Sequence, residues 1–278
     1  DELLGRDLGL DSLTMVEVLT WLETEFAAQN VDVQSLATVR DVALAAAGLS
    51  GGVSVASLRE IEPEWFAPGE LSPLEGETLS KAFFNQAERA PGRFIVADQA
   101  SGALTYRRFA VAACALAGKI EKIPGSYVGI MMPAAVATDI AYMACLFAGK
   151  TPVMVNWTVG VRQMAHSLDL LGVDAVITAK AFADRVEFML GSLGGLKERF
   201  VYLEDVRRTF SLFDKLGAWL RARFFSGGLC KSDRSDTAVV LFTSGSETLP
   251  KAVALSHENI IANVRDLLSV FHLRSEEK

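Results

Sequence analysis

The chain has 278 residues, of which 50% are hydrophobic and 22% are charged, and its formal net charge is −7. This balance is typical of a globular protein and excludes a disordered chain. The three cysteines and three histidines are widely spaced and form neither a disulfide framework nor a metal-ligand pattern. The composition therefore predicts a protein of the reducing cytoplasm without a dedicated metal site, and its negative charge argues against nucleic-acid binding.

The negative charge is concentrated near the start of the chain. Residues 1–47 hold nine acidic and two basic residues, which account for the whole net charge of −7. This asymmetry predicts a separate acidic module with basic partners. Its periodicity predicts a helix over residues 12–26 with Asp11 as N-cap, and a short helix over residues 39–49. The first helix carries an apolar stripe of Met15, Val18, Leu19, Leu22 and Phe26. Its acidic residues lie off that stripe and are expected to face water or a partner; they are Glu17, Glu23 and Glu25.

Residues 48–75 contain paired glycines and several prolines, a composition that predicts a linker. Beyond it, helical and strand patterns alternate. Helices are expected over residues 78–88, 109–120 and 136–147, and strands over 94–98, from 104, 127–132, 151–156 and 173–178. The apolar stretch 127–149 is long enough for a membrane span, but Pro133 and Asp139 interrupt it, which favours a buried strand and helix. The alternation is typical of βαβ units in a largely parallel sheet.

Residues 210–225 predict a basic amphipathic helix. Its apolar stripe consists of Phe213, Leu216, Leu220 and Phe224. Its positive charges, beside Trp219, are Lys215, Arg221 and Arg223. Three interpretations remain open: the stripe packs on the core, it docks the acidic module, or it rests on an anionic lipid surface.

The stretch 236–268 points to a phosphate site. Residues 236–242 predict a short buried strand, and residues 252–268 carry helix-spaced apolar residues. Between them lies a turn of small and hydroxyl-bearing residues that ends at Lys251. Small residues let backbone N–H groups approach an anion, hydroxyls add donors, and the lysine adds a positive charge. The spacing is not that of a Walker A loop, and the alternative is a Ser/Thr-rich loop without a ligand.

This turn resembles the T-S-G-S-T-G-x-P-K-G signature of the adenylate-forming enzymes, the acyl-CoA and acyl-carrier-protein synthetase superfamily. The matching residues are Thr243, Ser244, Gly245, Ser246, Pro250 and Lys251. The V-x-L-S-H-x-N continuation is matched by Val253, Leu255, Ser256, His257 and Asn259. Three positions differ from the signature: Glu247, Thr248 and Ala252, the last two in place of glycines.

Further segments resemble the same superfamily over residues 76–272, with gaps. Leu104-Thr105-Tyr106-Arg107 stands where L-T-Y-x-E-L is expected, and Gly149 to Val153 where G-x-x-P-V is expected. Residues 149–160 and 202–216 are most similar to the acyl-acyl-carrier-protein synthetase branch, which is known from bifunctional acyltransferase/synthetases.

The start of the chain resembles a second family. Residues 8–13, Leu-Gly-Leu-Asp-Ser-Leu, match the L-G-x-D-S-L signature of acyl and peptidyl carrier proteins. The resemblance implies that Ser12 carries 4′-phosphopantetheine, a phosphodiester that a helix N-terminus favours. The alternative is that Asp11 and Ser12 only cap the helix. Seven residues precede Leu8, too few for the first helix of that family, so the carrier module is expected to be partial.

Together the resemblances imply an α/β protein. A partial helical carrier bundle (residues 1–47) and a linker (48–75) are followed by the N-terminal portion of an AMP-binding adenylation domain (76–278) with a mixed, largely parallel sheet. They also imply a bacterial-type ligase of lipid metabolism that uses ATP and Mg²⁺ to activate a fatty acid or other carboxylic acid as acyl-adenylate. The acyl group then passes to a phosphopantetheine thiol.

The implied site residues are Ser12 for phosphopantetheine and, for the ATP phosphates, Thr243, Ser244, Gly245, Ser246, Glu247 and Lys251. The catalytic residues are expected beyond residue 278, so the chain alone is expected not to form acyl-adenylate. Expected partners are a phosphopantetheinyl transferase, an acyltransferase domain and, as an open alternative, the membrane surface. The alternative functions are a carrier and interaction module with a degenerate adenylation half, or a loading module of a polyketide or phospholipid acyl-transfer system.

Overall fold

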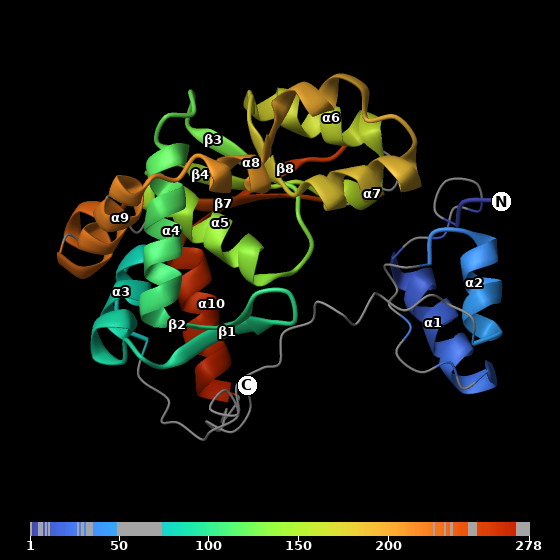
Figure 1. The fold of residues 1–278 in the computed structure, drawn as a ribbon, viewed down its shortest axis with the longest axis horizontal. Helices are drawn as coiled ribbons and strands as arrows, with labels where there is room; N and C mark the ends of the chain where they lie inside the picture. Colours follow the sequence, from blue (N-terminus) through green and yellow to red (C-terminus); the bar gives the residue numbers. More distant parts are fainter. Residues whose placement is uncertain are drawn as a thin grey trace.

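A computed structural model describes residues 2–4, 8, 10, 12–26, 28, 31, 36–48, 74–224, 226–230, 232–233, 236–243 and 249–270. Most of the described chain forms an α/β unit around a six-stranded sheet (Figure 1). In chain order its strands are β3 (Tyr127–Ile130), β4 (Thr151–Met154), β5 (Val176–Thr178), β6 (Phe200–Tyr202), β7 (Thr237–Phe242) and β8 (Ala252–Ser256). They lie in the order β6-β5-β3-β4-β7-β8.

Every neighbouring pair in this sheet is parallel except β7 and β8, which are antiparallel. The expectation of a mixed, largely parallel sheet is therefore confirmed. A separate antiparallel hairpin is formed by β1 (Phe94–Asp98) and β2 (Gly102–Thr105).

Helices cover both faces of the sheet, as the apolar strands of a parallel sheet require. The first face carries α3 (Leu79–Arg89), α4 (Tyr106–Ile120), α5 (Val136–Phe147) and α9 (Leu212–Phe224). The second carries α6 (Val161–Leu171) and α7 (Lys180–Leu190). The remaining helical segments are α8 (Leu203–Arg208), α10 (His257–Val270) and the short 3-10 turns Trp157–Val159, Gly194–Arg199 and Ser226–Leu229.

Two hydrophobic cores result, one on each side of the sheet. The first is built around four phenylalanine rings, and the second contains Met164 and Leu168. The four rings are those of Phe83, Phe84, Phe109 and Phe147. Successive strand residues point to opposite sides. On β5, Ile177 therefore belongs to the first core and Val176 to the second.

The sequence predictions agree with most of these elements but not with the segment after Lys251. The expected helix over 252–268 is wrong in its first part, because residues 252–256 form β8 and α10 begins at His257. The turn returns the chain along the edge of β7, whose backbone groups then pair with β8 from Phe242↔Ala252 onward. A paired edge satisfies backbone groups that would otherwise stay open. The predictions also contain no helix at α6 or α7.

The N-terminal unit contains α1 (Ser12–Phe26) and α2 (Val39–Ala46). Its small core is formed by Leu4, Leu22, Ala28, Leu36 and Ala45. Met15, Val18 and Leu19 pack against that core as the predicted stripe requires, whereas Phe26 is 45% exposed. The acidic side chains of Glu17, Glu23 and Glu25 are exposed, as expected.

The stripe on α9 is not part of the core. Phe213 is 86% exposed and Phe224 is 61% exposed, and Leu216 is also exposed. The residue of α9 that is buried is Ala218, on the opposite face. The interpretation in which the stripe packs on the core is therefore wrong.

Gly129 allows β3 and β5 to lie side by side. It pairs with Val176, and a Cβ atom at this position would lie 2.9 Å from Val176 Cγ2. We expect Gly129→Ala to lower the free energy of unfolding by about 1–3 kcal/mol, since overpacking a buried contact forces its neighbours to shift. Urea denaturation measures this. Gly92→Ala is the matched control, because a Cβ atom there has no neighbour within 4 Å. Equal denaturation midpoints for the two variants would contradict the prediction.

Candidate functional site

The candidate site begins where β7 ends. Thr243 and Lys251 close the loop between β7 and β8: the Thr243 N–H donates to the Lys251 carbonyl (3.1 Å), and the Lys251 N–H donates to Thr243 Oγ1 (3.2 Å). Two of the predicted phosphate-binding residues therefore lie together at the base of the loop. We call this bonded pair, Thr243 and Lys251, the loop neck. The predicted residues Ser244, Gly245, Ser246 and Glu247 lie outside the described residues.

The loop neck lies at the carboxyl edge of the parallel strands. Strands β3 to β7 all run in the same direction, so the residue after β7 emerges at the edge where their carboxyl ends meet. Open α/β sheets bind their ligands outside this edge. The Lys251 side chain is exposed, and within the described residues it makes no ion pair. Among the described residues, no acidic side chain therefore competes with an anionic ligand for its ammonium group.

A helix N-terminus near the same edge is already occupied. The carboxylate of Asp98 accepts a hydrogen bond from the N–H of Val136, the first residue of α5 (2.8 Å), and another from the N–H of Ser101. Burial raises the pKa of Asp139 in the first turn of α5, and the negative charge of Asp98 raises it further. The start of α5 therefore carries negative charge and does not compete with the loop neck for a phosphate. Local sequence patterns contain no sign of this contact between β1 and α5.

The matched continuation Ser-His-x-Asn begins a helix. The Asn259 N–H donates to Ser256 Oγ (3.1 Å), and the Ser256 N–H donates to Asn259 Oδ1 (3.0 Å), which is a reciprocal capping arrangement. His257 is fully buried, and its Nδ1 accepts the N–H of Leu79 at the start of α3 (3.2 Å). These residues of the signature thus bond to backbone N–H groups: Ser256 and Asn259 cap the start of α10, and the His257 side chain links α10 to α3.

His257 makes folding sensitive to pH. Burial lowers the pKa of His257, and the charge of Asp236 opposes this only in part. Below the ordinary histidine pKa of about 6.5, the unfolded chain therefore binds more protons at this residue than the folded protein does. The stabilisation is complete above that pH and is lost as the pH falls through the interval below it, by at most about 1.4 kcal/mol per pH unit. Protonation also removes the acceptor that Leu79 uses.

Urea denaturation at a series of pH values measures the effect. We expect His257→Asn to flatten the pH dependence in this interval, because an amide oxygen accepts a hydrogen bond without titrating. His166, which is only half-buried, provides the control variant His166→Asn. A wild-type slope retained in the His257 variant would show that another group is responsible.

The second predicted site, Ser12, is the first residue of α1. Its position at a helix start agrees with the expectation, while its side chain and the preceding Asp11 lie outside the described residues. Trp21 and Phe26 are half exposed on α1, with ring centroids 4.9 Å apart. The exposed face of α1 therefore combines acidic and aromatic side chains.

Among the described residues, no group of three or more His, Cys, Asp or Glu side chains is placed to hold a metal ion. In the same part of the chain, no helix has the length and hydropathy needed to cross a bilayer.

Comparisons with known proteins agree with the fold. The medium/long-chain-fatty-acid–CoA ligase FadD6 of Mycobacterium tuberculosis is 30% identical over 134 residues, which is 48% of this chain and 21% of that protein. The nonribosomal peptide synthetase atnA of Emericella nidulans is 27% identical over 195 residues, 67% of this chain and 2% of that protein. The chain therefore spans 21% or less of the length of these curated relatives.

A solved structure shares the fold. The fatty acyl-adenylate ligase from L. pneumophila, in complex with acyl adenylate and pyrophosphate, superposes with a TM-score of 0.56 at 19% identity, covering 77% of this chain and 35% of that one. The family described as AMP-binding enzyme matches residues 83–277, a region that includes the loop neck and every strand of the central sheet. This match extends over more than half of the chain, and the chain belongs to the AMP-binding enzyme family of adenylate-forming proteins.

Proposed function

We propose that the chain is part of an ATP-dependent acid–thiol ligase that activates a carboxylic acid, with a fatty acid as the favoured substrate, and transfers the acyl group to a carrier-bound thiol. The observation that carries the proposal is the loop neck, in which the signature residues Thr243 and Lys251 lie together at the carboxyl edge of the parallel strands. The fatty-acid substrate is supported by the resemblance of residues 149–160 to acyl-acyl-carrier-protein synthetases and by a relative named as a fatty-acid–CoA ligase.

The reaction needs activation because a carboxylate is a poor electrophile without a leaving group. A carboxylate oxygen attacks the α-phosphorus of ATP and pyrophosphate leaves; a thiolate then attacks the acyl carbon and AMP leaves. Lys251, Thr243 and the loop between them would hold the β- and γ-phosphates and stabilise the negative charge that develops on pyrophosphate. The loop residues with this proposed role are Ser244, Gly245, Ser246 and Glu247. Mg²⁺, when bound to the nucleotide phosphates, would supply further positive charge.

The thiol would be supplied by Ser12. A phosphopantetheinyl transferase would attach the arm to the Ser12 hydroxyl at the start of α1, and residues 48–75 would act as the tether. A tether raises the effective concentration of the thiol at a neighbouring site without any new contact. The exposed acidic side chains Glu17, Glu23 and Glu25 would then be available to the basic surface of a partner, such as an acyltransferase domain.

The alternative is a carrier module whose adenylation half has lost activity, because Thr248 and Ala252 replace glycines of the signature. One of these replacements carries little weight. Ala252 lies in β8 opposite Phe242, an extended backbone position that needs no glycine. The alternative therefore rests on Thr248, which lies outside the described residues.

Carboxylate-dependent ATP–pyrophosphate exchange tests the proposal. The assay compares residues 1–278 with the complete gene product, in the presence of medium- and long-chain fatty acids. We expect exchange with the complete product and none with residues 1–278. Absence of exchange in both, together with phosphopantetheine attachment at Ser12, would favour the carrier module. Robust exchange with residues 1–278 alone would show that the catalytic groups lie within them.

A further inference from the structure

Helix α9 is attached to the protein by its polar side. Lys119 on α4 pairs with Asp214 (3.2 Å), and Arg221 pairs with Glu121 just after α4 (3.4 Å). Hydrogen bonds from the backbone and hydroxyl of Ser211, together with Lys119, lower the pKa of Asp214 to about 2. Asp214 therefore stays ionised at neutral pH. The small side chain of Ala218 allows the close approach between the two helices.

The opposite side of α9 is apolar and open to solvent. Its residues, which we call the α9 stripe, are Leu212, Phe213, Leu216, Trp219, Leu220 and Phe224. Leu212 and Phe213 are more than four-fifths exposed and project from the start of the helix. An amphipathic helix of a soluble domain normally buries its apolar side. Contiguous apolar surface of this kind marks an interaction site on a soluble protein.

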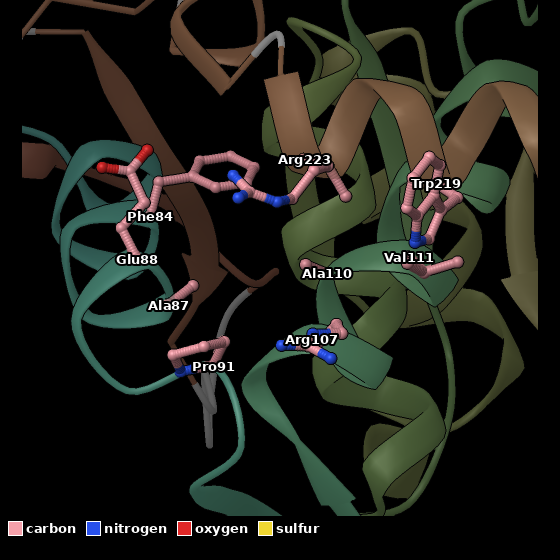
Figure 2. A pocket seen from close by; sticks show the side chains of 10 residues that line it. Phe84, Ala87, Glu88, Pro91, Arg107, Ala110, Val111, Trp219 and Arg223 are labelled. Atoms are coloured by element: carbon pink, nitrogen blue, oxygen red, sulfur yellow. The ribbon is translucent and has the colours of Figure 1, made fainter.

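A pocket of about 630 Å³ lies next to the stripe, between α3, α4 and α9 (Figure 2). Seven of its ten lining residues are apolar, among them Phe84, Val111 and Trp219. Its charged residues are Arg107 from α4, Arg223 from α9 and Glu88 from α3, so the lining has two cations and one anion.

The two arginines are available to a ligand. Within the described residues, neither the Arg107 nor the Arg223 guanidinium makes an ion pair. Arg223 lies over the ring of Phe224, 5.2 Å from its centroid, at the border between the pocket and the stripe. Lys215, also exposed, adds a cation to the same helix. A site that combines guanidinium groups, a pocket and an adjoining row of bulky apolar side chains matches a molecule with an anionic head and apolar chains.

We propose that α9 is a membrane-surface helix: the α9 stripe enters the interface of an anionic phospholipid bilayer, and the pocket between α3, α4 and α9 receives a lipid phosphate at Arg107 and Arg223. The charge of the site selects this occupant. A second copy of the chain bound through the same face would bring the Arg223 and Lys215 cations of both copies into one interface. The acidic helix α1 is the competing occupant, but its carboxylates lie along a helix surface and offer no head group with attached chains to fill a pocket. The proposal is independent of the proposed acid activation.

Vesicle flotation with residues 1–278 tests it. Vesicles of phosphatidylcholine alone are compared with vesicles that contain phosphatidylglycerol. We expect binding to the anionic vesicles only. Phe213→Glu is expected to lower the partition coefficient about tenfold to a hundredfold, the contribution of a buried aromatic side chain. Arg107→Gln and Arg223→Gln are each expected to lower it about fivefold, the contribution of one cation at an anionic surface.

Phe188→Glu is the matched control, because Phe188 on α7 is also a strongly exposed phenylalanine but lies on the other side of the sheet. It should bind vesicles as the wild type does. Equal losses for the Phe188 and Phe213 variants, or no binding of the wild type, would overturn the proposal. So would self-association that Phe213→Glu abolishes without vesicle binding, which would identify a second copy as the occupant. Binding that appears only after Glu17, Glu23 and Glu25 are changed to Gln would identify α1.

Discussion

Lys251→Ala is expected to lower carboxylate-dependent ATP–pyrophosphate exchange in the complete gene product by about 10²–10³-fold. This is the usual effect of removing one preorganised group that stabilises developing negative charge. Within the described residues, Thr243 bonds to Lys251 through the backbone N–H and carbonyl of the lysine and not through its side chain, so the substitution leaves the hairpin closed. The loss should therefore come from the ammonium group and not from a rearranged loop.

Two further variants make this result specific. Lys251→Arg keeps the charge and should restore part of the activity. Thr243→Val removes the hydroxyl that accepts the Lys251 N–H, and should lower both activity and the stability of the neck. Exchange at the wild-type rate in Lys251→Ala, under conditions where substrate is not saturating, would remove the basis for placing the nucleotide phosphates at this loop.

Ser12→Ala is expected to abolish the modification of the chain by a phosphopantetheinyl transferase and coenzyme A. The alanine has no hydroxyl to accept the phosphodiester, and mass spectrometry of the intact protein reads the result directly. Thr20→Ala on the same helix is the matched control. Its hydroxyl bonds to the Val16 carbonyl within α1, and its loss should leave the modification complete.

The same variant separates the two chemical steps. In the complete product, Ser12→Ala should retain ATP–pyrophosphate exchange and lose the radiolabelled acyl group that becomes covalently attached to the protein. Attachment that persists in Ser12→Ala would mean that a different residue, or a separate carrier, receives the acyl group. Modification at a residue other than Ser12 would contradict the assignment of residues 1–47 as a carrier module.

Elements governed by local periodicity were predictable from the sequence. The helix at residues 136–147 has the predicted bounds. The apolar residues that form it and the residues at which it starts and ends are neighbours in the sequence, so no long-range contact is needed to place it. Strand β8 was not predictable in the same way. The helix-spaced apolar residues behind the predicted helix over 252–268 all lie in α10, and residues 252–256 extend because their backbone pairs with the edge of β7.

The candidate sites show the same division. Thr243 and Lys251 belong to one signature, so their proximity followed from the loop between them. The amphipathic character of α9 was also predictable from the sequence, but the side of the helix that faces solvent was not. Lys119 and Glu121, which pair with Asp214 and Arg221, are distant in sequence, and these pairs turn the apolar side outward. The carboxylate of Asp98 at the start of α5 is a similar long-range contact.

The buried bond between His257 and Leu79 has a mechanical consequence. Lys251 is followed directly by β8, β8 by His257, and the imidazole of His257 is fastened to the first turn of α3. Strand β8 therefore connects the loop neck to α3, the helix that supplies Phe84 and Glu88 to the pocket beside α9. A shift of Lys251 along the axis of β8 would therefore disturb the pairing of β8 with β7 and would also break the imidazole bond or displace α3.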